Sequence, residues 1–198
     1  MSDITPTRSV VIALKDERRT MREGYAFLDE KCLLLAGAML AEVRRFDAMR
    51  EALRALQEEA LRALEAAAAR HGLHGVQCYP AADAAPLAVR TTRRSLLGVA
   101  LLEARLDGVA AKAEPAANPS PEAEAARAAF ARLLPKLVEM AAMIGNLERL
   151  YQEYRRTVRR VRALQDVLLP EIDVTLYEVE TRLEELEQDE ALWVRLKR

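Results

Sequence analysis

The chain has 198 residues, of which 51% are hydrophobic, 31% charged and only 5% aromatic, with seven glycines and a formal net charge of −1. This composition is typical of long helices and not of a compact mixed core. The charge gives no overall attraction for nucleic acid, and no apolar run approaches the ~20 residues of a membrane span. With two distant cysteines and no signal-peptide pattern, we expect a cytoplasmic protein in a reducing compartment.

Residues 8–70 are predicted to form one long helix. Thr5-Pro6-Thr7 is a suitable helix start, because proline is tolerated in the first turn and threonine can cap. The stretch His71–Gly75 should end the helix, because glycine is common just past a helix terminus. Residues at alternating spacings of three and four form a coiled-coil seam, here called the first seam, in which only Arg18 and Glu42 are charged. The first seam comprises Leu14, Arg18, Met21, Tyr25, Leu28, Cys32, Leu35, Met39, Glu42, Phe46, Met49, Leu53, Leu56, Ala60, Ala63 and Ala67.

Residues 71–120 differ in kind, since four of the eight prolines lie there and a fifth, Pro121, follows directly. The stretch 76–79 is compatible with a short strand. Residues 87–92 and 99–102 flank a turn-like segment and indicate a β-hairpin, although 96–106 would also suit a short helix. Residues 116–121 form a linker, and Ser120 followed by Pro121 should start the next helix.

Residues 121–198 predict a second long helix. Its proposed apolar positions, the second seam, are Phe130, Leu133, Leu137, Met140, Ile144, Leu147, Tyr151, Tyr154, Val158 and Val161, continued by Leu164, Leu168, Ile172, Leu176, Val179, Leu183 and Leu186. Pro135 should bend the helix, and Pro170 removes one helical hydrogen bond. Near Pro170 the spacing of four repeats, which is a stutter in the heptad pattern. We interpret it as a change of helix geometry and not as a helix end.

A connection of this length allows the two helices to pair antiparallel within one chain. The predicted fold is therefore mainly all-α: a long antiparallel two-helix coiled coil (1–70 and 121–198) with a middle segment (71–120) in which the local pattern allows a hairpin or a short helix. If the numbers of facing residues sum to roughly 205, Arg18 meets Glu187 or Glu190, and Glu42 meets Arg159 or Arg162; such charges fix register.

The sequence contains no motif for catalysis, cofactor binding or metal binding. His71 and His74 lie beside glycines at an expected helix end, and two ligands do not make a metal site. A dense basic patch comprises Arg155, Arg156, Arg159, Arg160 and Arg162. It fits either a solvated helix face or a contact with an acidic partner, and no aromatic platform for nucleic acid accompanies it.

Both ends of the chain resemble a known family. Pro6-Thr7-Arg8, Leu14-Lys15, Gly24 and Leu28-Asp29-Glu30-Lys31 resemble the N-terminal signature of the D subunit of V/A-type ATPases. The run Thr157–Leu164, followed by Leu168-Leu169-Pro170, is similar to the C-terminal signature of the same family, as is the stretch from Leu183 to Arg198.

This resemblance implies a noncatalytic central-stalk rotor protein without a cofactor. Its terminal helices would form a shaft inside a hexamer of catalytic and non-catalytic nucleotide-binding subunits. Its middle segment, with a hairpin, would bind the small F subunit, and its base would sit on a funnel-shaped subunit above the membrane ring. Rotation would couple ATP hydrolysis or synthesis to proton or sodium translocation, at the cytoplasmic side of the membrane. We expect partner contacts at Arg8, Arg18, Leu196 and Lys197 near the shaft tip, and at Arg159 and Arg160 lower down.

A structural or chaperone-type antiparallel coiled-coil protein is the alternative. It shares the helical hairpin but does not need the Thr157–Pro170 signature. The shaft of F-type ATP synthase does the same work with a larger central domain, for which residues 71–120 leave no room.

Overall fold

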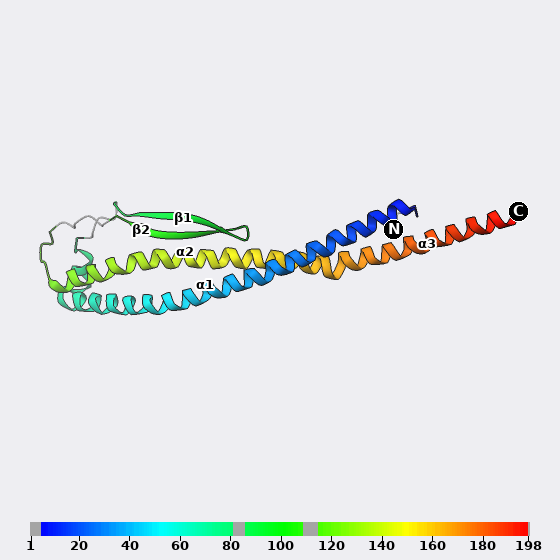
Figure 1. Ribbon diagram of the computed structural model, residues 1–198. Coiled ribbons are helices and arrows are strands. Elements are labelled where there is room, and N and C mark those ends of the chain that lie inside the picture. Colours follow the sequence, from blue (N-terminus) through cyan, green and yellow to red (C-terminus); the bar gives the residue numbers. More distant parts are fainter. Residues whose placement is uncertain (1–4, 81–85, 109–114, 198) are drawn as a thin grey trace. The chain divides into compact units, whose positions relative to one another are not determined.

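The computed structural model describes residues 5–80, 86–108 and 115–197. Along the chain lie α1 (Arg8–Gln77), β1 (Ala88–Leu96), β2 (Val99–Asp107), α2 (Pro121–Ala163), a π-helix η1 (Leu164–Leu168) and α3 (Leu169–Leu196) (Figure 1). The predicted class, a mainly helical antiparallel pair with a hairpin between the helices, is confirmed. The chain divides into two compact units, the first formed by Met1–Ala36 with Glu153–Arg198 and the second by Gly37–Gln152.

In the first unit, the start of α1 packs antiparallel to α3. Val11 forms a buried cluster with Leu176 and Val179. Ion pairs flank this core, with 2.7 Å between Lys15 Nζ and Glu180 Oε1 and 3.3 Å between Arg18 Nη1 and Asp173 Oδ1.

The predicted partners of Arg18, Glu187 and Glu190, are therefore wrong. Arg18 binds Asp173, while Glu187 accepts hydrogen bonds from Arg8. The prediction aligned the two chain ends, whereas α3 continues beyond its pairing with the first turn of α1 and ends at Leu196. Aligning the chain ends thus misplaced the register by about four helical turns.

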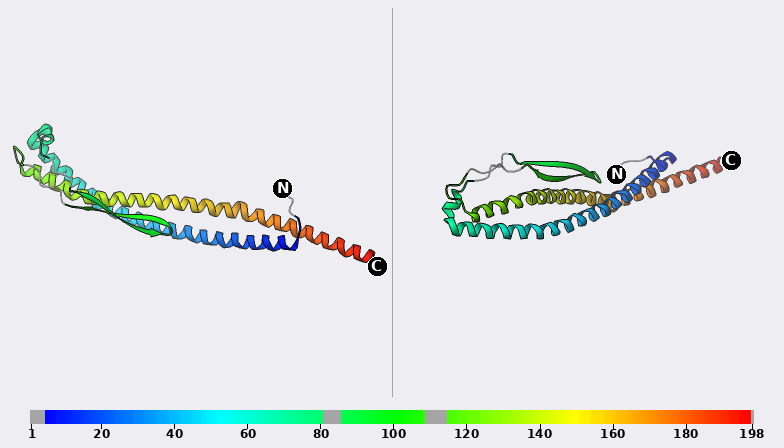
Figure 2. Two further views of the ribbon diagram at one scale, coloured as in Figure 1. Left: turned by 90° about the horizontal axis from the view of Figure 1, so that it is seen from above. Right: turned by 60° about the vertical axis from the view of Figure 1, so that its left-hand side comes forward.

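In the second unit, the later part of α1 packs antiparallel to α2 (Figure 2). One buried cluster joins Leu53 to Leu133 and Met140. A second joins Ala67 to Ala123 and Ala126, where small side chains allow the helices to approach closely. Every residue of the first seam is buried or half-buried, so its predicted inward face is confirmed.

The second seam was predicted only in part. Leu133, Met140, Leu147, Tyr154 and Val161 are buried or half-buried, as expected. The other position of each heptad is exposed in Phe130, Leu137, Ile144 and Tyr151. One residue earlier in each heptad, Ala129, Lys136, Met143, Leu150 and Thr157 are buried or half-buried instead. The inward row contains alanine, lysine and threonine, whereas the adjacent exposed row is entirely apolar or aromatic. Hydrophobicity alone therefore favoured the wrong row.

The helix ends follow local rules. The Thr7 hydroxyl accepts a hydrogen bond from the Val10 N–H at 3.4 Å, and the Ser120 hydroxyl accepts one from the Ala123 N–H at 3.2 Å. Both residues therefore act as the predicted N-caps. Gly72 interrupts α1 with a φ of 72°, a conformation that glycine adopts without steric cost. The helix resumes and ends at Gln77, so a strand over 76–79 is wrong.

Pro170 lies just after η1, at the start of α3. The Leu169 N–H bonds to the Leu164 carbonyl, five residues earlier, so the extra residue of the stutter is absorbed as a π turn. The helical path continues into α3, as predicted. Beyond the π turn, Ile172, Leu176 and Val179 return to the buried face.

The hairpin is confirmed and the alternative helix over 96–106 is wrong. β1 and β2 pair antiparallel from Ala88 with Asp107 to Leu96 with Val99. Leu97 and Gly98 form the turn with φ values of 53° and 84°. Two successive positive φ angles match the tight turn that suits the twist of a two-residue hairpin.

The observed register predicts which engineered cysteines can be joined. In a chain with Cys32 and Cys78 replaced by alanine, Val11→Cys and Val179→Cys should form an intramolecular disulfide, since both side chains belong to one buried cluster. Non-reducing electrophoresis and mass spectrometry of the oxidised monomer measure the product.

The matched control is Met21→Cys with Leu183→Cys. These two residues would face each other in the register predicted from the sequence, in which the numbers of facing residues sum to roughly 205. It should stay reduced within one chain under the same conditions. Efficient linkage of 21 to 183, without linkage of 11 to 179, would contradict the observed register.

Candidate functional site

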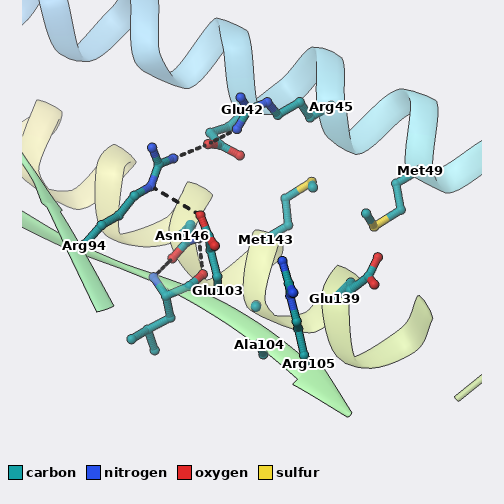
Figure 3. Close-up of a pocket in the computed structure, with 12 residues that line it drawn as sticks. Glu42, Arg45, Met49, Arg94, Glu103, Ala104, Arg105, Glu139, Met143 and Asn146 are labelled. Carbon is teal, nitrogen blue, oxygen red and sulfur yellow. Dashed lines mark hydrogen bonds and ion pairs between the residues drawn. The ribbon is translucent and has the colours of Figure 1, made fainter. Parts of the chain in front are cut away.

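Asn146 on α2 holds the hairpin against the helices of the second unit (Figure 3). Its side-chain oxygen accepts a hydrogen bond from the Leu102 N–H, and its amide nitrogen donates one to the Leu102 carbonyl, both at 2.7 Å. Asn146 is buried and also accepts a bond from Arg149. One amide thus satisfies both backbone groups of a strand residue, as a neighbouring strand would.

Glu42 on α1 is the second polar anchor of the hairpin. Its carboxylate lies 3.2 Å from the guanidinium of Arg94 on β1 and 3.2 Å from that of Arg45. Glu42 is only 7% exposed, so it is buried with two cationic partners. Arg159 and Arg162, the partners predicted for it, are not its ion-pair partners in the structure. The actual partner belongs to a strand, which helix–helix periodicity could not reveal.

A cavity of about 290 Å³ lies between the hairpin, α1 and α2. Arg45, Arg94 and Arg105 line it together with Glu42, Glu103 and Glu139, and the apolar lining includes Met49 and Met143 (Figure 3). Three arginines and three glutamates line the cavity, so their formal charges balance. Among the lining residues, Glu42 and Asn146 position the hairpin through their bonds to Arg94 and Leu102.

Lys31 and Glu153 form a half-buried ion pair in the first unit. Lys31 Nζ donates to Glu153 Oε1 at 2.6 Å, and the two side chains are 19% and 24% exposed. This hydrogen bond, with the positive charges of Lys31, Arg156 and Arg160, holds the pKa of Glu153 below its ordinary value, against the effect of burial. One turn later, the buried Thr157 hydroxyl donates to the Glu153 carbonyl.

The residues predicted to contact partners lie in the first unit. Arg8 forms an ion pair with Glu187 but stays 81% exposed, and Arg18 pairs with Asp173. Leu196 is 80% exposed at the end of α3, where Lys197 caps the helix through its backbone N–H. Arg159 and Arg160 are exposed near the end of α2. Their contacts with partners remain predictions.

The last turns of α3 expose large apolar side chains, of which sequence analysis singled out only Leu196. Leu192, Trp193, Val194 and Leu196 are 55–80% exposed. Figures 1 and 2 show α3 continuing past the start of α1, which leaves these turns without that helix beside them. An exposed apolar cluster of this kind is a candidate protein-binding surface.

Neither a metal centre nor a membrane-spanning helix is found among the described residues. Over the described ranges 5–80, 86–108 and 115–197, no group of three or more histidine, cysteine or acidic side chains could hold a metal ion. Within the same ranges, no helix is both long and apolar enough to span a membrane. His71, one of the two histidines considered as a metal ligand, bonds to the capping Ser120 hydroxyl at 2.6 Å.

A sequence profile of the family described as the D subunit of ATP synthase matches residues 10–198. This chain belongs to the family of ATP synthase D subunits.

Full-length relatives share the same description. The D subunit of the V-type ATP synthase of Thermotoga neapolitana is 27% identical over 98% of this chain and 96% of the relative. The D subunit of the A-type enzyme of Methanopyrus kandleri is 28% identical over 100% of this chain and 86% of the relative. The D subunit of the V-type enzyme of Thermus thermophilus is 31% identical over 100% and 88%.

The match to the family profile includes all the helices and the hairpin, since it runs from the first turn of α1 to the chain end. It identifies the chain as one component of an ATP synthase complex. Sequence analysis missed Asn146, the Lys31–Glu153 pair and the strand partner of Glu42. Of these three features, only Glu42 could be noticed in the sequence, because it is a charged residue within the apolar first seam. Its charge did not indicate that its partner is Arg94 on a strand.

The Lys31–Glu153 pair predicts a pH-dependent stability. Because the pKa of Glu153 is lower in the folded chain than in the unfolded chain, its ionised carboxylate stabilises the fold at pH values above the ordinary glutamate pKa. This stabilisation is lost as the pH falls through the lowered pKa of the folded state. Lys31→Met should cost about 1–2 kcal/mol at pH 7, because it leaves a half-buried carboxylate unpaired. The cost should shrink as the pH falls below about 4. Urea unfolding between pH 3 and 7 measures it.

Arg132→Met is the matched control, since Arg132 pairs with Glu59 at 2.6 Å but both side chains are more exposed. It should cost less than about 0.5 kcal/mol at pH 7. Equal effects of the two substitutions, or a cost for Lys31→Met that does not change with pH, would show that the ion pair does not lower the glutamate pKa.

The Asn146 anchor predicts a graded loss of hairpin protection. Asn146→Leu removes both bonds to Leu102 and should weaken hairpin docking by about 1–3 kcal/mol. Asn146→Asp keeps an acceptor for the Leu102 N–H but cannot donate to its carbonyl while ionised, so its effect should be intermediate. Hydrogen exchange of residues 99–104, measured by mass spectrometry, reports docking. Unchanged exchange in Asn146→Leu would show that the hairpin does not depend on this anchor.

Proposed function

We propose that this chain is the noncatalytic central rotor of a V/A-type ATP synthase. Its rotation couples ATP hydrolysis or synthesis in a hexamer of catalytic and non-catalytic nucleotide-binding subunits to proton or sodium translocation. The terminal helices, 1–70 and 121–198, serve as the shaft, and residues 71–120 form the middle segment. The protein acts at the cytoplasmic face of the membrane, as a peripheral part of the complex.

The exposed apolar end of α3 is the observation that carries this proposal. Trp193 and Leu196 are 66% and 80% exposed in a family whose members are ATP synthase subunits. A ring of surrounding subunits would cover these side chains and remove their apolar surface from water. Arg8, which pairs with Glu187, and Lys197 lie near this end and supply charged contacts at its rim, while Arg18 lies farther along the shaft beside Asp173 and is proposed to contact a partner there.

An asymmetric shaft suits rotary coupling. One chain folded back on itself presents different side chains at each angle, so that otherwise equivalent nucleotide sites are held in different states. A symmetric homodimer would present the same face twice. Arg159 and Arg160 are proposed to contact the lower part of the hexamer.

The middle segment is proposed to bind the small F subunit, and the shaft base a funnel-shaped subunit above the membrane ring. The hairpin is suited to the first role, since Glu42 and Asn146 fix it on the helices with β1 exposed. A rigidly docked hairpin gives a partner a preorganised surface and reduces the entropic cost of binding.

Co-expression with the nucleotide-binding subunits of the same complex tests the rotor role. Native mass spectrometry should find one copy of this chain per hexamer. Trp193→Ser with Leu196→Ser should reduce that association at least tenfold, because polar side chains remove the apolar contact. The helical content of the free chain should not change in circular dichroism.

Leu73→Ser is a matched control, since Leu73 is 75% exposed but belongs to the middle segment, 71–120, and not to the proposed shaft. It should leave one copy per hexamer. Several symmetric copies around a ring, or no association at all, would reject the rotor role and favour a structural coiled-coil protein.

A further inference from the structure

β1 presents an open strand edge. Its residues pair with β2 without a bulge, and those from Ala88 to Ser95 are all exposed. In the part of the chain that the structure describes, the sheet has only these two strands. The outer edge of β1 therefore carries backbone donors and acceptors that could pair with a further strand.

The Asn146 contact shows which groups these are. Asn146 binds the N–H and C=O of Leu102, so both groups point away from β1. Leu102 is paired with Arg93, and in an antiparallel pair of this type the groups of both residues point outward. Because the two pair types alternate, the N–H and C=O of Val89, Thr91 and Ser95 also point outward.

The two edges of the hairpin are thus unequal. The β2 edge faces α2, where Asn146 satisfies Leu102 and where Leu101 and Ala104 are buried. None of the described residues covers the β1 edge in this way, and β1 contains no proline or bulge that would block pairing. Threonine and valine, which favour strands, stand at two of its outward positions.

Charge selects the kind of strand that can join. β1 contains three arginines and no acidic residue. Arg90 pairs with Asp107, and Arg94 pairs with Glu42 and Glu103. For Arg93, at the centre of the outward row, no carboxylate partner is found among the described residues. A second copy of β1 would bring arginines against arginines, which disfavours pairing between two copies.

We propose that the outer edge of β1 binds an extended acidic segment of another protein, which adds to the hairpin as a third strand. Backbone hydrogen bonds to Val89, Thr91, Arg93 and Ser95 hold the segment, and a glutamate or aspartate opposite Arg93 sets its register. This interaction does not depend on the rotor role.

NMR titration of the full-length, 15N-labelled chain tests the proposal. The probe is a capped nine-residue peptide of alternating valine and glutamate, and the control peptide has lysine in place of glutamate. The acidic peptide should shift the amide signals of the four outward residues and bind at least tenfold more tightly than the lysine peptide. Equal binding of both peptides, no binding, or shifts centred elsewhere would overturn the proposal.

Two substitutions separate edge pairing from simple charge attraction. Thr91→Pro removes one outward donor but no bond to β2, so it should weaken binding at least tenfold while the inward N–H groups of Arg90 and Thr92 stay protected. Thr91→Val, the matched control, should bind as the parent chain does. Arg93→Glu should reverse the preference towards the lysine peptide.

Retained binding by Thr91→Pro would overturn strand addition. Concentration-dependent protection of the β1 edge without any peptide would assign it to a second copy of the chain and would also overturn the proposal. Neither outcome bears on assembly with the hexamer, which the co-expression experiment measures separately.

Discussion

Burial of an apolar stripe along α1 is the constraint on which the structure depends. A helix of this length with one apolar face gains little from propensity alone and needs a partner along that face. The chain supplies the partner from its own C-terminal part, through clusters such as Val11 with Leu176 and Leu53 with Leu133. In the second unit, the hairpin packs on the paired helices through Glu42 and Asn146. In the first unit, α3 extends beyond its pairing with α1 and exposes its end.

The polar residues within the helix contacts have separate tasks. Glu42 reaches across to Arg94 and Asn146 to Leu102, so both connect the helices to the hairpin. Thr157 bonds to the carbonyl one turn earlier and therefore satisfies its hydroxyl within its own helix. Buried polar groups cost stability unless they are bonded, and each of these three is bonded.

The junction of α2 and α3 shows how the chain accommodates a proline without ending a helix. The π turn from Leu164 to Leu168 adds one residue to the helical path just before Pro170. It has no buried residue, so the change of geometry falls where little packing depends on it. Beyond it the apolar face returns at Ile172 and Leu176, which lets one long segment serve two stretches of α1.

The sequence by itself determined the features that arise from neighbours along the chain. Helix periodicity, the helix starts at Thr7 and Ser120 and the interruption at Gly72 depend on a few adjacent residues, and each is present, although α1 continues past Gly72 to Gln77. The local pattern left both a hairpin and a short helix over 96–106 open, and the family resemblance favoured the hairpin. The family was likewise recognisable from short signatures at the two ends. The tertiary structure alone decided which of two adjacent rows of α2 faces α1, because a shift of one residue rotates a side chain by only about 100° and both rows are partly apolar. It also decided the partners of Arg18 and Glu42. These depend on register between distant segments and on the position of a strand, and neither quantity is encoded in local spacing.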